Sequence, residues 1–194
     1  MTRLVLSSLV VVPSLLLGQA ASKMTPAFWK SLGEAYDLNR RNEWPVLESY
    51  QPVLERDLIS DGIIASLNSP NNYDNLDFRQ YLRTHSHFKH IPLSTDRTEQ
   101  ILVLDDWTCG VYGCTISVFS RSSGRLRPVL QMFGTTLFIQ RKLSLGFHDV
   151  AVYGGSIASG EFLLYRWNGA EYKLSGCMSQ IKEDVVEKKC GAEK

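Results

Sequence analysis

The stretch from Ile101 to Phe119 constrains the fold more than any other part of the sequence. It consists of an apolar run, a short turn flanked by Cys109 and Cys114, and a second run in which apolar and polar residues alternate. That order predicts a β-hairpin. Two cysteines on opposite arms of so short a turn are close enough to bridge, and Gly110 and Gly113 can supply positive φ angles to the closed loop. We therefore expect a disulfide-locked hairpin at the centre of a β-sheet.

The N-terminal segment has the three parts of a secretory signal. Arg3 gives a positively charged start, Leu4 to Leu17 form a short apolar core, and Gly18-Gln19-Ala20 offers small residues to a signal peptidase. An uncleaved membrane anchor would need roughly 20 apolar residues, and this core is shorter. We expect cleavage after Ala20, with a cut one or two residues later as the alternative. The mature protein, residues 21–194, is then a soluble exported protein of the periplasm or the medium that does not span a membrane.

The charge of the chain is nearly balanced. There are 21 Lys and Arg residues against 20 Asp and Glu residues, and loss of Arg3 with the signal brings the two numbers closer still. Proteins that bind nucleic acids usually carry a strong basic excess or a basic stripe. We therefore do not expect nucleic acid as a partner.

The four cysteines all lie in the second half of the chain. An even number of cysteines in an exported protein favours disulfides over metal ligands or free thiols. The hairpin favours a Cys109–Cys114 bridge, which leaves Cys177–Cys190 to tie back the C-terminal segment. A zinc site would usually show two pairs of closely spaced cysteines, and only one such pair occurs here.

Two regions of the chain carry helical patterns. Over residues 25–83, Thr25 is a good N-cap before Pro26, and apolar residues then recur at spacings of three and four as far as Leu38. Further helical stretches are expected over residues 45–67 and 76–83. A C-terminal helix is expected within residues 177–190, tethered by the second disulfide.

The region from residue 87 to residue 175 reads as strands separated by turn-forming residues at short intervals. The strand from Ile101 to Asp105 is apolar on both faces and should be central. Asn168-Gly169 is the strongest hairpin signal and suits a type I′ turn. The expected fold is a single α+β domain, in which N-terminal helices pack on a curved antiparallel meander of about six to eight strands.

Three motifs between residues 98 and 174 recur together in other proteins. They are the Cys109-Gly-x-x-Gly-Cys114 hairpin after Ile101-Leu-Val-Leu, the segment Gly146-Phe-His-Asp149, and the segment Trp167-Asn-Gly-Ala-Glu-Tyr172. In this combination the chain resembles a loose group of bacterial exported proteins with a C-G-x-G-G-C hairpin. The resemblance implies a curved antiparallel sheet related to propeller blades, and most members of the group have no assigned activity.

The same group often carries an Asp-x-Asp-Gly loop that suggests calcium. Here the corresponding segment, Ser94 to Glu99, lacks the glycine and the second aspartate. Because the turn that directs several oxygens to one ion is missing, we do not expect a calcium loop. Gly-rich phosphate-binding motifs are also absent from the sequence, and we expect no cofactor.

A histidine cluster and several aspartates are the candidates for catalysis. His85 and His87 point to the same face if they lie on a strand, as two imidazole ligands of one metal ion must. Asp105, Asp106 and Asp149 could act as general acids or bases if their environments separate their pKa values. A metal-dependent or carboxylate-based hydrolase that uses the His85–His90 cluster is therefore the alternative function. Surface histidines and turn-capping aspartates are the simpler interpretation.

Aromatic residues near expected loop tips suggest recognition of a partner. A disulfide would pre-organise the tip that carries Trp107 and Tyr112, which lowers the entropic cost of binding. We expect a non-catalytic exported binding module of the cell envelope whose partner is a protein or a cell-wall glycan. By analogy, inhibitors of cell-wall hydrolases and immunity proteins against them are small proteins of this kind. The expected partner-binding residues are Trp107, Tyr112, Tyr153 and Trp167.

Overall fold

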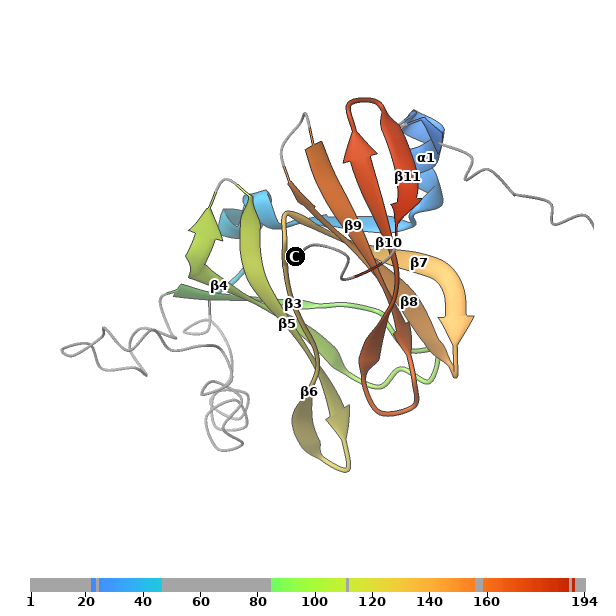
Figure 1. The fold of residues 1–194 in the computed structure, drawn as a ribbon. Helices are drawn as coiled ribbons and strands as arrows, with labels where there is room; N and C mark the ends of the chain where they lie inside the picture. The colour runs from blue at the N-terminus through green and yellow to red at the C-terminus, as the bar shows by residue number, and fades with distance from the viewer. Residues whose placement is uncertain are drawn as a thin grey trace, which may run out of the picture.

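A computed structural model describes residues 22–23, 25–46, 85–110, 112–155, 159–188 and 190 of the chain. These residues form two antiparallel β-sheets that pack against each other (Figure 1). The predicted signal segment lies outside the described residues. None of the helices in the described part is long and apolar enough to cross a membrane.

The first sheet has four strands in the order β3-β4-β5-β6. Each strand pairs with the next one along the chain, so the sheet is a simple meander. Ile101 to Leu104 are all buried in β4, on both faces of an internal strand, which confirms the prediction that this strand is central. The strands are β3 (Ser86–His90), β4 (Gln100–Gly110), β5 (Gly113–Ser122) and β6 (Arg125–Gly134).

The second sheet has seven strands in the order β1-β11-β10-β9-β8-β7-β2. Strands β7 to β11 are another meander, and two short N-terminal strands complete its edges. The strands are β1 (Ser22–Lys23), β2 (Glu34–Asp37), β7 (Thr136–Ser144), β8 (Phe147–Gly155), β9 (Ser159–Trp167), β10 (Tyr172–Ile181) and β11 (Asp184–Lys188). The expected single meander of six to eight strands is therefore wrong, because the chain divides its strands between two sheets.

The chain passes from the first sheet to the second at Thr135, between β6 and β7. The Thr135 N–H donates to the carbonyl oxygen of Tyr153 at 2.7 Å, and the Thr135 carbonyl accepts from the Leu38 N–H at 3.0 Å. The main apolar core lies between the two sheets, where alternate residues of both meet. It includes Leu102, Leu104, Ile116, Val118, Leu130, Leu137, Ile139, Val150 and Val152.

A second apolar cluster lies on the other face of the seven-stranded sheet, under α1 (Pro26–Ser31). Trp29 of α1 stacks on Phe138 with ring centroids 5.8 Å apart and also contacts Phe162. The expected cap is confirmed, because the Phe28 N–H donates to the Thr25 hydroxyl at 3.2 Å.

The expected N-terminal helical layer is wrong in the part that the structure describes. The helix α1 has six residues, and the chain continues as β2 and the 3₁₀ helix η1 (Leu38–Glu43). Gly33 ends the helix with a φ of +102°, and a Cβ there would lie 1.9 Å from the carbonyl oxygen of Ile139. Pairing of β2 with β7 thus overrides the helical spacing of the apolar residues. The predicted helix over residues 45–67 lies outside the described residues except at its first two positions, where Val46 forms a β-bridge with His87, and the predicted helix over residues 76–83 lies wholly outside them.

The predicted C-terminal helix is also wrong. Strands β10 and β11 form a hairpin through Lys182, which has a φ of +57°. Val185 is buried against the apolar cluster under α1, and β-branched valines suit a half-buried strand better than a helix. The Cys177–Cys190 bridge therefore connects β10 to the second residue after β11.

Candidate ligand groove between the two sheets

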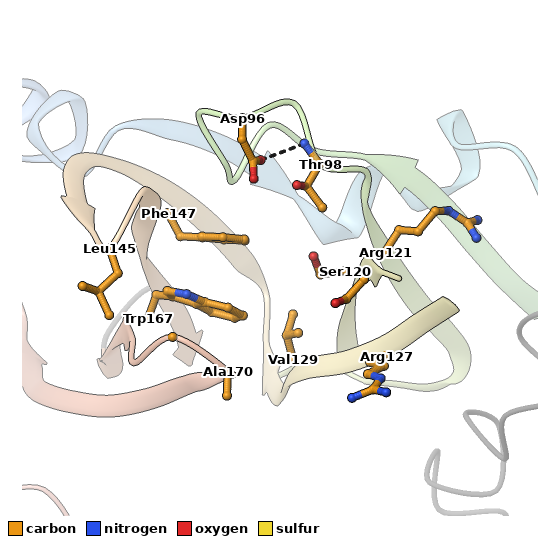
Figure 2. A pocket seen from close by; sticks show the side chains of 12 residues that line it. Asp96, Thr98, Ser120, Arg121, Arg127, Val129, Leu145, Phe147, Trp167 and Ala170 are labelled. Atoms are coloured by element: carbon orange, nitrogen blue, oxygen red, sulfur yellow. Dashed lines mark hydrogen bonds between the residues drawn. The ribbon is translucent and has the colours of Figure 1, made fainter. Parts of the chain in front are cut away.

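A groove of about 520 Å³ opens between the two sheets at the end where their hairpin turns meet (Figure 2). We call it the inter-sheet groove. Its lining comes from segments far apart in the sequence, namely the β3–β4 loop, β5, β6, the β7–β8 turn, the end of β9 and the β9–β10 turn. The lining residues are Asp96, Thr98, Ser120, Arg121, Ser122, Arg127, Val129, Leu145, Phe147, Trp167, Gly169 and Ala170.

The second sheet supplies an aromatic wall. Phe147 at the start of β8 stacks on Trp167 at the end of β9, with ring centroids 4.1 Å apart and planes inclined by 15°. Tyr172 packs edge-on against Trp167 at 5.3 Å and donates its hydroxyl to the carbonyl oxygen of His148 at 2.8 Å. Burial, and then the charge of Asp149, raise the pKa of Tyr172. The contacts of Tyr172 with Trp167 and with the His148 carbonyl oxygen hold the aromatic wall in place.

The first sheet supplies a polar wall. Figure 2 shows Thr98 and Ser120 across the cavity from the two stacked rings. The Asp96 carboxylate accepts the Thr98 N–H at 2.9 Å. Hydrogen bonds from the Thr98 side chain and then its backbone lower the pKa of Asp96 to about 2. Asp96 is therefore an anionic acceptor at neutral pH, beside hydroxyl groups that can both donate and accept.

Two arginines belong to the polar wall, and they differ in their surroundings. The Arg121 guanidinium forms an ion pair with Glu99 and also donates to the carbonyl oxygen of Gly124 at 3.1 Å. Arg127 lies directly opposite Ser120 in the pairing of β5 with β6, so both side chains project from the same face of the sheet. Within the described residues, Arg127 has no ion pair.

The mouth of the groove carries an exposed leucine in a strained backbone conformation. Leu145 and Gly146 form the β7–β8 turn with φ angles of +50° and +84°. A positive φ is unfavourable for a bulky residue and usually occurs at Gly or Asn. The Leu145 side chain is nonetheless 74% exposed. Strained residues of this kind are concentrated at functional sites.

Backbone contacts fix the β7–β8 turn against the β3–β4 loop. The Thr95 N–H donates to the carbonyl oxygen of Gly146 at 3.0 Å, and the His148 N–H donates to that of Leu93 at 2.7 Å. A β-bulge places Val129 between the paired residues Pro128 and Leu130, and Val129 lines the groove. Bulges often re-aim a side chain next to a functional site. The groove is thus a built feature of the junction between the sheets.

Both predicted disulfides are present. Cys109 and Cys114 bridge β4 and β5 with a Cα–Cα distance of 4.0 Å, and Cys177 and Cys190 bridge with a distance of 5.4 Å. No free cysteine occurs in the described part of the chain.

The locked hairpin tip does not contribute to the groove lining. Tyr112 is 65% exposed there, while the side chain of Trp107 lies outside the described part of the structure. Gly113 has the expected positive φ, and Gly110 does not. A Cβ on Gly113 would lie 2.4 Å from the carbonyl carbon of Gly134, so the tip is packed closely on the end of β6. Recognition of a partner through Tyr112 stays a prediction.

The other two predicted partner-binding residues lie in different places. Trp167 belongs to the aromatic wall of the groove. Tyr153 packs in the cluster under α1, against Trp29 and Phe162, and its hydroxyl donates to Gln180. Burial raises the pKa of Tyr153. The structure therefore does not bring Tyr153 and Trp167 together.

The Asn168-Gly169 hairpin is confirmed, with a different turn. Trp167 pairs with Tyr172, so the loop has four residues. The Asn168 side chain accepts the N–H groups of Ala170 and Glu171 at 2.9 and 3.0 Å. Gly169 has a positive φ of +103° and Asn168 does not, which corrects the expected type I′ turn. The longer loop brings Gly169 and Ala170 to the groove.

The predicted metal ligands are engaged with the protein. His87 of β3 is buried, with Nδ1 3.3 Å from the carbonyl oxygen of Trp44 and Nε2 3.9 Å from the Asp106 carboxylate. His90 lies 3.7 Å from Glu99, and His85 immediately precedes β3. Within the described residues there is no group of three or more His, Cys, Asp or Glu side chains that could hold a metal ion.

The candidate catalytic carboxylates are divided between the sheets. Asp106 is beside His87 on the first sheet, and the side chain of Asp105 lies outside the described part. Asp149 is 4% exposed on the second sheet, with Arg166 at 3.6 Å and Lys142 at 3.9 Å from its Oδ2. Its Oδ1 atom has no hydrogen-bond partner among the described residues. A buried carboxylate between two cations is a structural ion-pair arrangement.

Several groove residues were not identified from the sequence. Arg127, Thr98 and Ser120 belong to ordinary polar positions of strands and loops, and nothing local distinguishes them. The Leu145-Gly146 pair between two strand patterns was the one available signal, because a leucine is unusual in a two-residue turn.

Comparison of the chain with protein-family models, curated proteins and solved structures finds no match.

Proposed function

We propose that the protein is an exported, non-catalytic binding module of the cell envelope and that its ligand occupies the inter-sheet groove. The observation that carries the proposal is the contrast between the two walls of the groove. An aromatic stack faces a wall of hydroxyl, carboxylate and guanidinium groups across a volume suited to a small ligand or one unit of a polymer. Ligand sites combine an apolar surface with a few well-placed polar groups in this way.

Of the two expected partner classes, the groove favours a glycan over a protein segment. A peptide would bind most simply by adding a strand to the exposed edge of β6. Pro128 removes one donor from that edge, and the bulge at Val129 disrupts its regular spacing. Both features protect an edge strand against such pairing. A sugar ring needs no strand edge, because its C–H groups can pack against the edge of the aromatic pair while its hydroxyls meet the polar wall.

Export to the cell envelope is supported by the two disulfides, which are compatible with an oxidising compartment. A module that holds a cell-wall glycan would also shield it from hydrolases. The protein would then inhibit a cell-wall hydrolase by protecting the substrate of that enzyme.

The test is an array of envelope saccharides and peptides probed with the mature protein and a groove-filling variant. Ala170 is exposed at the rim, so Ala170→Trp should fill the groove without disturbing the core. Ile181→Trp, at an exposed site away from the groove lining, is the matched control. The proposal expects saccharide signals that Ala170→Trp abolishes and Ile181→Trp retains. Signals that both variants retain would place the ligand elsewhere.

A further inference from the structure

We infer that the ligand of the inter-sheet groove is an acidic saccharide, with its carboxylate bound by Arg127 and its hydroxyls bound at the opposite rim. This inference rests on the proposed function, because it assigns a chemical class to the ligand of the same groove. It is argued from the position of Arg127, the arrangement of charges across the groove, and the hydroxyl-rich lining.

Arg127 is the cation that the fold leaves available. Figure 2 shows the guanidinium groups of both arginines directed away from the aromatic wall, and the two differ because Arg121 is already neutralised by Glu99. Arg127 is exposed, and within the described residues it has no ion pair. A guanidinium group can bind a carboxylate through two parallel hydrogen bonds, which makes arginine well suited to recognise this anion.

The charges across the groove give the ligand a direction. Figure 2 shows Asp96 and Thr98 at one rim and Arg127 at the opposite rim. Asp96 stays ionised at neutral pH and can only accept hydrogen bonds, so it favours ligand hydroxyls and repels a carboxylate. The anionic group of the ligand is therefore expected beside Arg127, and its hydroxyl groups beside Asp96.

The lining between these charges suits a sugar ring. Ser120 and Ser122 provide hydroxyls that can donate and accept, as sugar hydroxyls do, and the Thr98 hydroxyl, which donates to Asp96, can accept. Figure 2 shows the stacked rings of Phe147 and Trp167 edge-on, so an apolar aromatic edge faces these hydroxyls and can contact the C–H groups of a sugar ring. The exposed Leu145 extends this surface at the mouth of the groove.

The test is calorimetric titration of the mature protein with matched saccharides. Oligomers of glucuronic acid and wall fragments that contain N-acetylmuramic acid carry carboxylates from two different sources. Oligomers of N-acetylglucosamine of the same length are the neutral control, and a short peptide with a free C-terminal carboxylate tests the other ligand class.

Arg127→Gln removes the proposed anion contact, and Arg141→Gln makes the same charge change on β7 away from the groove lining. We expect an acidic probe to bind at least tenfold more tightly than the neutral one. Arg127→Gln should raise its Kd roughly tenfold to a hundredfold, the effect of losing a charge-assisted hydrogen bond, and Arg141→Gln should not. Whichever acidic probe binds, the glucuronic acid oligomer or the N-acetylmuramic acid fragment, identifies the kind of acidic saccharide that the groove recognises.

Four results would overturn the inference: equal binding of acidic and neutral saccharides, an unchanged Kd in Arg127→Gln, binding of the peptide alone, or failure of all the saccharides to bind. If acidic and neutral saccharides bind equally and Ala170→Trp abolishes both, the inference fails while the proposed function stands.

Discussion

Phe147 and Trp167 stack with their ring centroids 4.1 Å apart, and the pair forms the aromatic wall of the groove. Phe147 begins β8 immediately after the strained β7–β8 turn, and Trp167 ends β9 immediately before the β9–β10 turn. The stack therefore couples the two hairpin turns that border the groove. Anything that alters the stack should alter ligand binding.

Replacement of Phe147 by leucine should separate binding from folding. Phe147→Leu keeps an apolar side chain at this half-buried position, so we expect a loss of about 1 kcal/mol in unfolding free energy, largely from the aromatic pair. Saccharide affinity should fall at least tenfold because the aromatic edge that Phe147 contributes to the groove is lost. Urea unfolding and calorimetric titration measure the two effects, and an unchanged affinity would remove the aromatic wall from the site.

Relief of the strain at Leu145 should stabilise the protein and weaken binding. Asparagine tolerates a positive φ far better than leucine, so Leu145→Asn should raise the unfolding free energy by about 1 kcal/mol. Ligand affinity should fall, because an apolar group is removed from the mouth of the groove. Lys182→Asn, at a φ of +57° in the β10–β11 turn, is the control and should give the stabilisation alone. If both variants bind normally, Leu145 has no part in recognition.

Because the two sheets approach each other closely at Gly134, replacement of that glycine by any larger residue should destabilise the protein. A Cβ there would lie 2.4 Å from Val152 Cγ1 and 2.7 Å from the carbonyl oxygen of Tyr153. We expect Gly134→Ala to destabilise the protein by about 1–3 kcal/mol, as overpacking does. At Gly154, the nearest atoms to a new Cβ are 3.7 Å away, so Gly154→Ala should change stability much less. Thermal unfolding compares the two, and equal effects would contradict the close approach of the sheets at Gly134.

The two disulfides should contribute unequally to stability. Their sequence separations are 5 residues for Cys109–Cys114 and 13 for Cys177–Cys190. In the chain-entropy model, removal of the disulfide that closes the longer loop should lower the unfolding free energy by about 3 kcal/mol. Removal of the disulfide that closes the shorter loop should lower it by about 2 kcal/mol. Denaturant unfolding of the two double Cys→Ser variants measures the difference. A larger loss from the shorter loop would show that the hairpin disulfide acts chiefly through native packing.

Stability should fall in alkaline solution, and Tyr172 should contribute to the fall. Burial and the charge of Asp149 raise the pKa of Tyr172 in the folded protein, whereas the unfolded chain releases this proton near pH 10. Above that pH the unfolded state binds fewer protons than the folded state, so the unfolding free energy decreases as pH rises. Tyr172→Phe should flatten this decrease, while Tyr112→Phe at the exposed tip should not. Unfolding curves measured from pH 8 to pH 11 test the difference.

The predictions that succeeded depend on strong local chemistry. The hairpin from Ile101 to Phe119 was predictable because glycines, cysteines and apolar runs all point to one structure. The C-terminal cysteine pairing followed by elimination. The helical predictions failed where pairing of distant strands decided the structure, as in β2 against β7 and β10 against β11. Local spacing cannot show such partners.

The groove could not be predicted because no short segment contains it. Its lining residues come from both sheets, and contacts between distant segments bring them together, such as the Thr95–Gly146 and Leu93–His148 hydrogen bonds. Trp167 was predicted to be a recognition residue because an aromatic residue next to a turn is visible in the sequence. Arg127 was not predicted, since its proposed role depends on the position that the β5–β6 pairing gives it.

A crystal structure of the mature protein with the saccharide that binds most tightly tests the central claim most directly. The account predicts the sugar ring against Trp167 in the inter-sheet groove, with its carboxylate within hydrogen-bonding distance of the Arg127 guanidinium. A saccharide bound at the Tyr112 hairpin tip, with nothing in the groove, would contradict the account.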